Sequence, residues 1–137
     1  MDTSVHHTAH SAYQLHYHLV WTPRYRKKVL VEPLESRLKA IFNEIADKHC
    51  FRILAVEVMP DHVHLFVAAP PKYSPSALIR LFKGTSSRLL GKEFPEIIHR
   101  HYWGKNATLW SEGYYAGTAG NVSAEIIRRY IEECQGK

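Results

Sequence analysis

The sequence predicts an α+β fold in which an antiparallel sheet carries its helices on one face. Three observations lead to this class. Apolar and polar side chains alternate along residues 13–21 and again along 62–69, as in half-buried strands. Apolar residues recur at helical spacing in 33–49 and in 74–91. The expected order is therefore β-α-β-β-α, followed by a further strand and a terminal helix.

The second and third strands are predicted to form a hairpin. Residues 51–58 lead through the tight turn Pro60-Asp61 into the strand that begins at His62. In the first of these two strands the side chains expected to share the buried face are Leu54, Val56 and Val58.

The helices are located by their starts and by their apolar spacing. Pro33 suits the first turn of a helix that runs to about residue 49. Ser74 is a capping residue before Pro75, and Gly91 marks the expected stop of this second helix. Its predicted buried stripe is Leu78, Leu81, Phe82, Thr85 and Leu89. Residues 94–106 are expected to be irregular, 109–118 to form a weak fourth strand, and the segment after 123 to form a terminal helix.

This order of elements is that of the ferredoxin-like, split βαβ fold. In that topology the first and third strands are neighbours in the middle of the sheet. We therefore expect the side chains of His16, His18, His62 and His64 on the face that the helices leave open. Nucleic-acid binders of this shape bind their ligands on that face.

Length, charge and cysteine content favour a single domain with a polyanionic partner. The 137 residues suffice for one core, and we expect a single domain over 13–137 behind a flexible tail at 1–12. A net charge of +5 favours a polyanion as the partner. The chain lacks a membrane-length apolar run and a secretory signal, and its two cysteines have no C-x-x-C spacing. We therefore expect a cytoplasmic location with free thiols.

Two basic segments are candidate contacts to a nucleic-acid backbone. Arg24, Arg26, Lys27 and Lys28 lie within five residues and surround one aromatic ring, that of Tyr25. Such a loop is either an ordinary solvated surface or a segment that binds phosphates while the ring stacks on a base. Along the second helix, three further cations lie largely off the buried stripe: Arg80, Lys83 and Arg88.

His62 and His64 are the candidate metal ligands. Residues two apart on a strand point to the same side, so two imidazoles can hold one divalent ion between them. Asp61 directly before them is a suitable partner for orienting a ligating histidine. His16 and His18 have the same spacing and compete for the same role. If neither pair binds a metal, both are simply polar residues on a solvated face.

Several stretches between Tyr13 and the end of the chain together form a recognisable pattern. The most specific is the His-x-His pair directly after Met59-Pro60-Asp61, with a tyrosine much later on the terminal helix. Further matching stretches are Tyr17-His18-Leu19-Val20-Trp21, Arg24-Tyr25-Arg26, Lys83-Gly84, Tyr102-Trp103-Gly104 and Arg129-Tyr130-Ile131-Glu132. In these residues the chain resembles the single-tyrosine HUH transposases, small insertion-sequence enzymes that act on single-stranded DNA.

The resemblance implies a role for three of these residues. Tyr130 is the implied nucleophile, which cleaves single-stranded DNA through a 5′-phosphotyrosine intermediate and frees a 3′-hydroxyl. His62 and His64 are the implied ligands of a divalent metal, Mg²⁺ or Mn²⁺, that polarises the scissile phosphate. The family also recognises DNA hairpins near the ends of its elements and works as a homodimer.

One position departs from the family pattern. The family places a glutamine one helical turn after the tyrosine as a third metal ligand, but here that position is Cys134, with Gln135 one residue further. Adjacent helix positions differ by about 100° in direction, so Gln135 does not simply replace it in a regular helix. Three arrangements stay open: a distorted helix end, ligation by Cys134, or two protein ligands with water.

Three functions remain open from the sequence. The first is a transposase that cleaves and rejoins single-stranded DNA at insertion-sequence ends. The second is a non-catalytic DNA- or RNA-binding protein of the same fold, which uses the basic residues but not Tyr130. The third is a domesticated relative that nicks DNA without transposing. Whether the tyrosine acts in its own chain's site or in a partner's also stays open. On chemistry alone the rival nucleophiles are Tyr102, Tyr114 and Tyr115.

Overall fold

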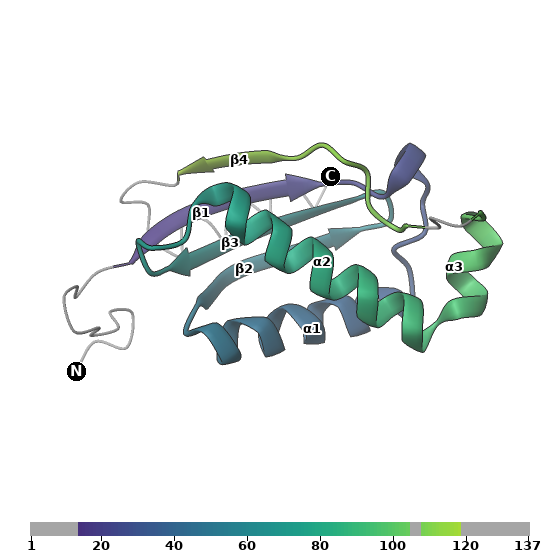
Figure 1. The fold of residues 1–137 in the computed structure, drawn as a ribbon, viewed down its shortest axis with the longest axis horizontal. Coiled ribbons are helices and arrows are strands. Elements are labelled where there is room, and N and C mark those ends of the chain that lie inside the picture. Colours follow the sequence, from purple (N-terminus) through teal and green to yellow (C-terminus); the bar gives the residue numbers. More distant parts are fainter. Residues whose placement is uncertain (1–13, 105–107, 119–137) are drawn as a thin grey trace.

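The computed structural model describes residues 14–104 and 108–118, which form a sheet layer and a helix layer (Figure 1). The predicted tail at 1–12 lies outside the described residues. So does the predicted terminal helix, with Tyr130, Cys134 and Gln135. Within the described part of the chain, the structure contains no helix of the length and apolarity needed to cross a membrane.

The sheet has four strands in the order β2-β3-β1-β4, and every neighbouring pair is antiparallel. The strands are β1 (Leu15–Trp21), β2 (Arg52–Met59), β3 (His62–Ala69) and β4 (Tyr115–Thr118). The α+β class and the antiparallel sheet are confirmed. So is the prediction that the first and third strands are neighbours, and the second and third strands form the predicted hairpin.

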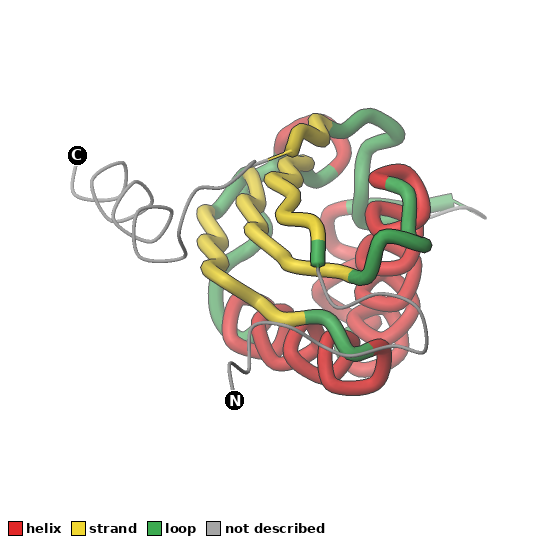
Figure 2. The backbone as a smooth tube through the Cα atoms, turned by 90° about the vertical axis from the view of Figure 1, so that its left-hand side faces the viewer, coloured by secondary structure: helices red, strands yellow, loops and turns green. Residues whose placement is uncertain are grey.

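The helices gather on one side of the sheet (Figure 2). They are α1 (Leu34–His49), α2 (Pro75–Glu93) and α3 (Pro95–His101), with a short 3₁₀ turn, η1, at Arg24–Arg26. As predicted, Ser74 caps α2, because its hydroxyl accepts a hydrogen bond from the backbone N–H of Ala77 at 3.1 Å.

Helix α3 corrects the expectation that residues 94–106 are irregular. Its sequence carries the usual signals of a short helix. Pro95 occupies the first turn, Glu96 lies near the positive end of the helix dipole, and three basic side chains lie near the negative end: His99, Arg100 and His101.

Edge-to-face aromatic pairs hold the two layers together. The ring of Trp21 on β1 meets that of Phe42 on α1 at a centroid distance of 5.7 Å, and Phe42 meets Phe82 on α2 at 5.5 Å. Trp110, from the segment before β4, packs against Trp21 at 5.8 Å. All four side chains are buried.

The buried side of α2 is rotated relative to the predicted stripe. Leu78 and Phe82 are buried as expected, but the other buried positions are Ile79, Ser86 and Leu90 instead of Leu81, Thr85 and Leu89. Ser86 tolerates burial because its hydroxyl accepts a hydrogen bond from Trp110 Nε1 at 2.9 Å and donates to the carbonyl of Phe82 at 2.6 Å.

Strand β2 also departs from simple alternation. An irregularity of register between Ile53 and Ala55 places Leu54 in a small apolar cluster with Phe66 and Ala68 instead of in the main core with Val58. The predicted strand at 109–118 is shorter than expected. Only β4 pairs continuously, and Trp110 forms a single bridge with Pro23.

Candidate functional site

The face of the sheet opposite the helices carries the histidines. In an antiparallel pair, residues directly opposite each other point to the same side. His18 lies opposite Phe66, and Val20 lies opposite His64, so the two central strands present their histidines on one surface. His16 shares this face but lies further along β1, opposite Ala68.

Glu57 joins His62 and His64 on this face. The hairpin register puts Glu57 of β2 directly opposite His64 of β3, with Met59 opposite His62. One ligand-type atom from each of Glu57, His62 and His64 lies within 4.8 Å of the others. Among the residues that the structure describes, this is the group of metal-ligating side chains that stands close enough to share one ion.

Asp61 orients His62. Its Oδ1 lies 2.8 Å from His62 Nδ1, and its Oδ2 lies 3.1 Å from Arg26 Nη2. The hydrogen bond to His62, with a smaller contribution from the charge of Arg26, lowers the pKa of the Asp61 carboxyl. The ionised carboxylate favours the proton on Nδ1 of His62, which leaves Nε2 with its lone pair.

His18 holds His64. His18 Nε2 lies 3.1 Å from His64 Nδ1, and the His18 ring stacks on Phe66 at a centroid distance of 4.2 Å. Burial, followed by the neighbouring His62 and His18, lowers the pKa of His64 to about 4. His64 is therefore neutral near neutral pH, which is the form in which histidine binds metals.

One carboxylate oxygen of Glu57 is buried without a hydrogen-bond partner in the part of the chain that the structure describes. Its residue is 4% exposed, and Oε2 has no hydrogen-bond partner among the described residues. Burial raises the pKa of Glu57, and the nearby His62 opposes this only in part. An unsatisfied buried acceptor costs about 1–3 kcal/mol, and a bound cation would remove that cost.

The residues present therefore fit a divalent metal. Their donor set is one carboxylate oxygen and two imidazole nitrogens. Two of the three donors are imidazole nitrogens, whereas Mg²⁺ prefers oxygen ligands throughout. Glu57 was missed by sequence reasoning. The available signal was its place two residues before Met59, on the same face of the hairpin as the histidines.

The first basic segment lies beside this cluster. Arg26 reaches it through Asp61, and Lys28 is exposed. Lys27 Nζ donates to the carbonyl of His101 at 2.7 Å, and Arg24 Nη1 donates to Thr108 Oγ1 at 3.1 Å. The segment is thus a structured turn with its cations on the surface.

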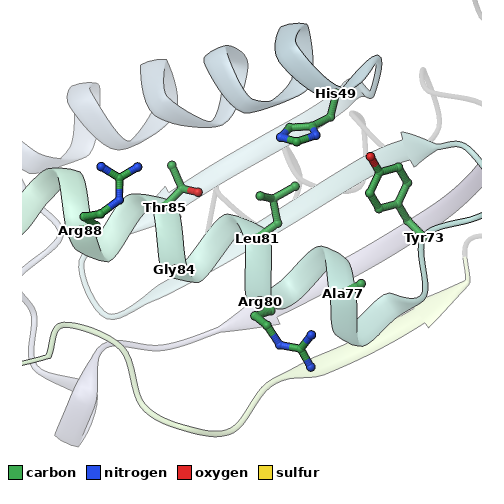
Figure 3. Close-up of a pocket in the computed structure, with 8 residues that line it drawn as sticks. All are labelled: His49, Tyr73, Ala77, Arg80, Leu81, Gly84, Thr85 and Arg88. Atoms are coloured by element: carbon green, nitrogen blue, oxygen red, sulfur yellow. The ribbon is translucent and has the colours of Figure 1, made fainter.

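The three predicted cations of α2 separate into two environments. Arg80 and Arg88 line a groove of about 450 Å³ in the helical layer, together with His49 and Tyr73 (Figure 3). Lys83 instead donates to the carbonyl of Ser111 at 2.6 Å and, at longer distances, to those of the next two residues. Burial lowers the pKa of Lys83, although the nearby Glu112 opposes this. Its amino group is thus already engaged by the loop before β4.

Comparison with known proteins agrees with this arrangement. The family model described as "Transposase IS200 like" matches residues 11–134. The ISDra2 transposase TnpA of Deinococcus radiodurans is 36% identical over 125 residues, which cover 91% of this chain and 87% of that protein. The chain belongs to the IS200-like transposase family. The resemblance seen in the sequence is confirmed, and this transposase family acts on DNA.

Other relatives of this IS200-like transposase support the same conclusion. The transposase for insertion sequence element IS200 of Salmonella typhimurium is 30% identical over 128 residues, covering 91% of this chain and 82% of that protein. A crystal structure of a Deinococcus radiodurans protein described as a transposase superimposes with a TM-score of 0.73 at 34% identity, covering 93% of this chain and 96% of the other. A REP-associated tyrosine transposase bound to a REP hairpin has a TM-score of 0.59 at 16% identity, covering 93% of this chain and 68% of the other, which shows the fold alone.

Proposed function

We propose that this IS200-like transposase cleaves and rejoins single-stranded DNA at insertion-sequence ends, with Tyr130 as the nucleophile. The observation that carries the proposal is the cluster of Glu57, His62 and His64 on the open face of the sheet. A transposase that transfers strands needs a site for the negatively charged phosphodiester. A cation held by this cluster supports such a site.

The proposed reaction exchanges one phosphodiester bond for another. The phenol oxygen of Tyr130 attacks the phosphorus, and the bond from phosphorus to the 3′-oxygen breaks. The products are a 5′-phosphotyrosine and a strand with a free 3′-hydroxyl, which takes the proton that the phenol loses. Rejoining reverses these steps with a different 3′-hydroxyl. The reaction needs neither water nor an external energy source.

The residues of the cluster have separate roles in this proposal. A bound divalent cation supplies a Lewis acid that offsets charge on the scissile phosphate. His62 and His64 would bind it through ring nitrogens. Asp61 fixes the ring of His62, and His18 fixes that of His64.

Glu57 is the proposed third protein ligand. Its unsatisfied Oε2 and its place opposite His64 support this assignment. In this proposal the sheet alone supplies three ligands. The replacement of the family's usual glutamine by Cys134 then does not leave the site short of a donor.

The proposed DNA contacts form two groups of basic residues, one for the cleaved strand and one for the DNA hairpin. Arg26 contacts Asp61 beside the metal cluster, so Arg26 and the two residues that follow it, Lys27 and Lys28, are assigned to the strand that enters the site. The proposed hairpin contacts are the two groove residues of α2, Arg80 and Arg88, and Arg24 is a proposed DNA contact on the turn after β1. Lys83 retains a proposed indirect role, because it holds the loop before β4. The active form is proposed to be a homodimer.

Covalent trapping tests this function. Full-length protein is incubated with Mn²⁺ and single-stranded DNA that carries the hairpin from the flank of its own gene. Wild type is expected to form a protein–DNA adduct that survives denaturation, and Tyr130→Phe is expected to bind the DNA without forming it. Tyr114→Phe serves as the matched control. An adduct that persists in Tyr130→Phe overturns the nucleophile, and a wild type that binds without any adduct points to the non-catalytic DNA-binding function.

The same assay tests the choice of histidines. His64→Ala is expected to abolish the adduct and spare hairpin binding, whereas His16→Ala is expected to retain most of the activity. If His16→Ala abolishes the adduct and His64→Ala does not, the metal ligands are on β1 instead of β3.

A further inference from the structure

Three aromatic rings gather where the turn after β1 meets the end of α3. Tyr25, Tyr102 and Trp103 line a hollow of about 320 Å³ together with Arg24, Lys27 and His101. Tyr25 is 76% exposed and Trp103 is 78% exposed, whereas Tyr102 is buried beneath them. Two large rings this exposed around one hollow leave apolar surface in water. Such surface is typical of a binding site.

The backbone that carries the Tyr25 ring has an unusual conformation. Tyr25 has φ 61° and the following Arg26 has φ 50°, so two consecutive bulky residues adopt the left-handed conformation. This conformation is strained for both residues, and such strain clusters at functional sites. The turn is anchored on both sides, because the Arg24 N–H donates to the carbonyl of Leu109 at 2.8 Å and Tyr102 donates its hydroxyl to the Arg24 carbonyl at 3.0 Å.

Cations lie over these rings. Lys27 Nζ is 5.4 Å from the ring centres of both Tyr102 and Trp103, and Arg24 Cζ is 5.4 Å from that of Tyr25. Lys27 is fixed there by its hydrogen bond to the His101 carbonyl. The surface therefore offers flat aromatic faces next to positive charge. An unpaired nucleotide presents the complementary chemistry, a flat base joined to a phosphate.

We propose that the exposed rings of Tyr25 and Trp103, with Lys27 and Arg24 beside them, form a stacking site for the base of one unpaired nucleotide in the DNA substrate. This inference rests on the proposed function, since it assigns a position to part of the same strand. Arg26 connects the turn through Asp61 to His62, so the bound nucleotide lies a short stretch of strand from the cleaved phosphate.

Tryptophan fluorescence gives a direct measurement of stacking. Of the three tryptophans, Trp21 and Trp110 are buried at 1% and 6% exposure, so a ligand on the surface quenches chiefly Trp103. The probes are the single-stranded oligomer dT8 and an abasic oligomer with the same number of sugar-phosphate units. Both are titrated into the full-length protein in EDTA. The first is expected to quench the emission, and the second is not.

Affinity measurements separate the ring contacts from the charge contacts. Trp103→Leu and Tyr25→Leu are each expected to weaken binding of labelled dT8 about tenfold, and to leave binding of the abasic oligomer unchanged. Tyr114→Leu removes an exposed ring outside this surface and is the matched control. Circular dichroism checks that each variant folds, and the two independent variants keep the test decisive if one of them does not.

Three results overturn the stacking site. The first is equal affinity of dT8 and the abasic oligomer for wild type, which means that only phosphates are bound. The second is unchanged dT8 affinity in both leucine variants. The third is an altered oligomeric state in Trp103→Leu with unchanged dT8 affinity, which makes the surface a protein interface.

This test and the test of the proposed function fail separately. Base-dependent quenching in a protein that forms no adduct at Tyr130 rejects the proposed function and keeps the stacking site. Adduct formation at Tyr130 without base-dependent quenching rejects the stacking site and keeps the proposed function.

Discussion

Replacing Glu57 by glutamine is expected to stabilise the metal-free protein while it weakens metal binding. The substitution keeps the shape of the side chain and removes its charge. In the wild type the residue is 4% exposed, and Oε2 lacks a hydrogen-bond partner among the described residues. The cost of such a group is about 1–3 kcal/mol. Glutamine still has polar atoms to satisfy, so the expected gain is about 1 kcal/mol in the free energy of unfolding.

The gain is expected to depend on pH. Burial raises the pKa of Glu57 in the folded protein above its unfolded value of about 4.3. Folding therefore favours the protonated carboxyl. The stability that this provides is fully present below the unfolded pKa and is lost as the pH rises through the folded pKa. The advantage of Glu57→Gln over wild type is thus small near pH 4 and largest at pH 8.

Metal is expected to reverse the order of the two proteins. Mn²⁺ at a hundred times its dissociation constant stabilises a protein by about 2.7 kcal/mol, provided that it binds only the folded state. Wild type gains this amount and Glu57→Gln gains much less. Urea unfolding at pH 5 and pH 8, with EDTA or with Mn²⁺, measures all four differences, and the electron paramagnetic resonance of free Mn²⁺ gives the affinity directly.

Asp47→Asn is the matched control, because Asp47 is an exposed carboxylate on α1. It is expected to change neither the stability nor the metal affinity by a measurable amount. Two results would refute the reasoning: Mn²⁺ affinity in Glu57→Gln equal to that of wild type, or a metal-free variant that is less stable than wild type at pH 8. The first result removes Glu57 from the metal site, and the second shows that its carboxylate is satisfied in the folded protein.

Two further predictions concern DNA and assembly. Replacing Arg26, Lys27 and Lys28 by alanine is expected to weaken the salt dependence of binding to single-stranded DNA. The slope of log affinity against log salt concentration should become shallower by about two units. An unchanged slope would make this turn an ordinary solvated surface. Tyr130→Phe chains and His64→Ala chains are each expected to be inactive alone. If a dimer shares its sites, mixing the two variants is expected to restore part of the DNA cleavage. A dimer in which mixing restores no cleavage would place each tyrosine in its own chain's site.

The face that carries the histidines was predictable from local sequence. Side chains alternate along a strand with a period of two, so His62 and His64 had to lie together once β3 was recognised. The order of elements then made β1 and β3 neighbours, which brought His18 to the same surface. Both steps need only regular strand geometry and the pattern of polar and apolar residues, and that pattern can be read from the sequence.

Glu57 was not predictable in the same way. A glutamate in a strand usually reaches solvent, because burial of an unpaired charge is costly. Glu57 lies opposite His64 because β2 pairs with β3, and a register shift between Ile53 and Ala55 accompanies the packing of Leu54 with Phe66. These are properties of the assembled sheet, and alternation along β2 alone gives the wrong face for Leu54.

The buried side of α2 depends on a segment distant in sequence. Apolar spacing alone made Leu81 and Leu89 good core residues, and Ser86 was not among the predicted buried positions. Trp110 changes this, because its indole N–H needs an acceptor in the core and the hydroxyl of Ser86 supplies one. The same segment accepts the hydrogen bonds of Lys83, so a cation that looked free to bind phosphate has a structural partner.

The segment before β4 connects the metal cluster with the aromatic surface. The Leu109 carbonyl accepts from the N–H of Arg24, and the N–H of Ser111 donates to the carbonyl of Thr22. These bonds fix the chain where it leaves β1, and that turn carries Tyr25 outward and Arg26 toward Asp61. A change that loosens this segment, such as the loss of the Lys83 amine, should therefore disturb the stacking surface and the orientation of His62 together. In contrast, replacing a single side chain of the turn should affect only one of the two: Tyr25 the stacking surface, or Arg26 the orientation of His62.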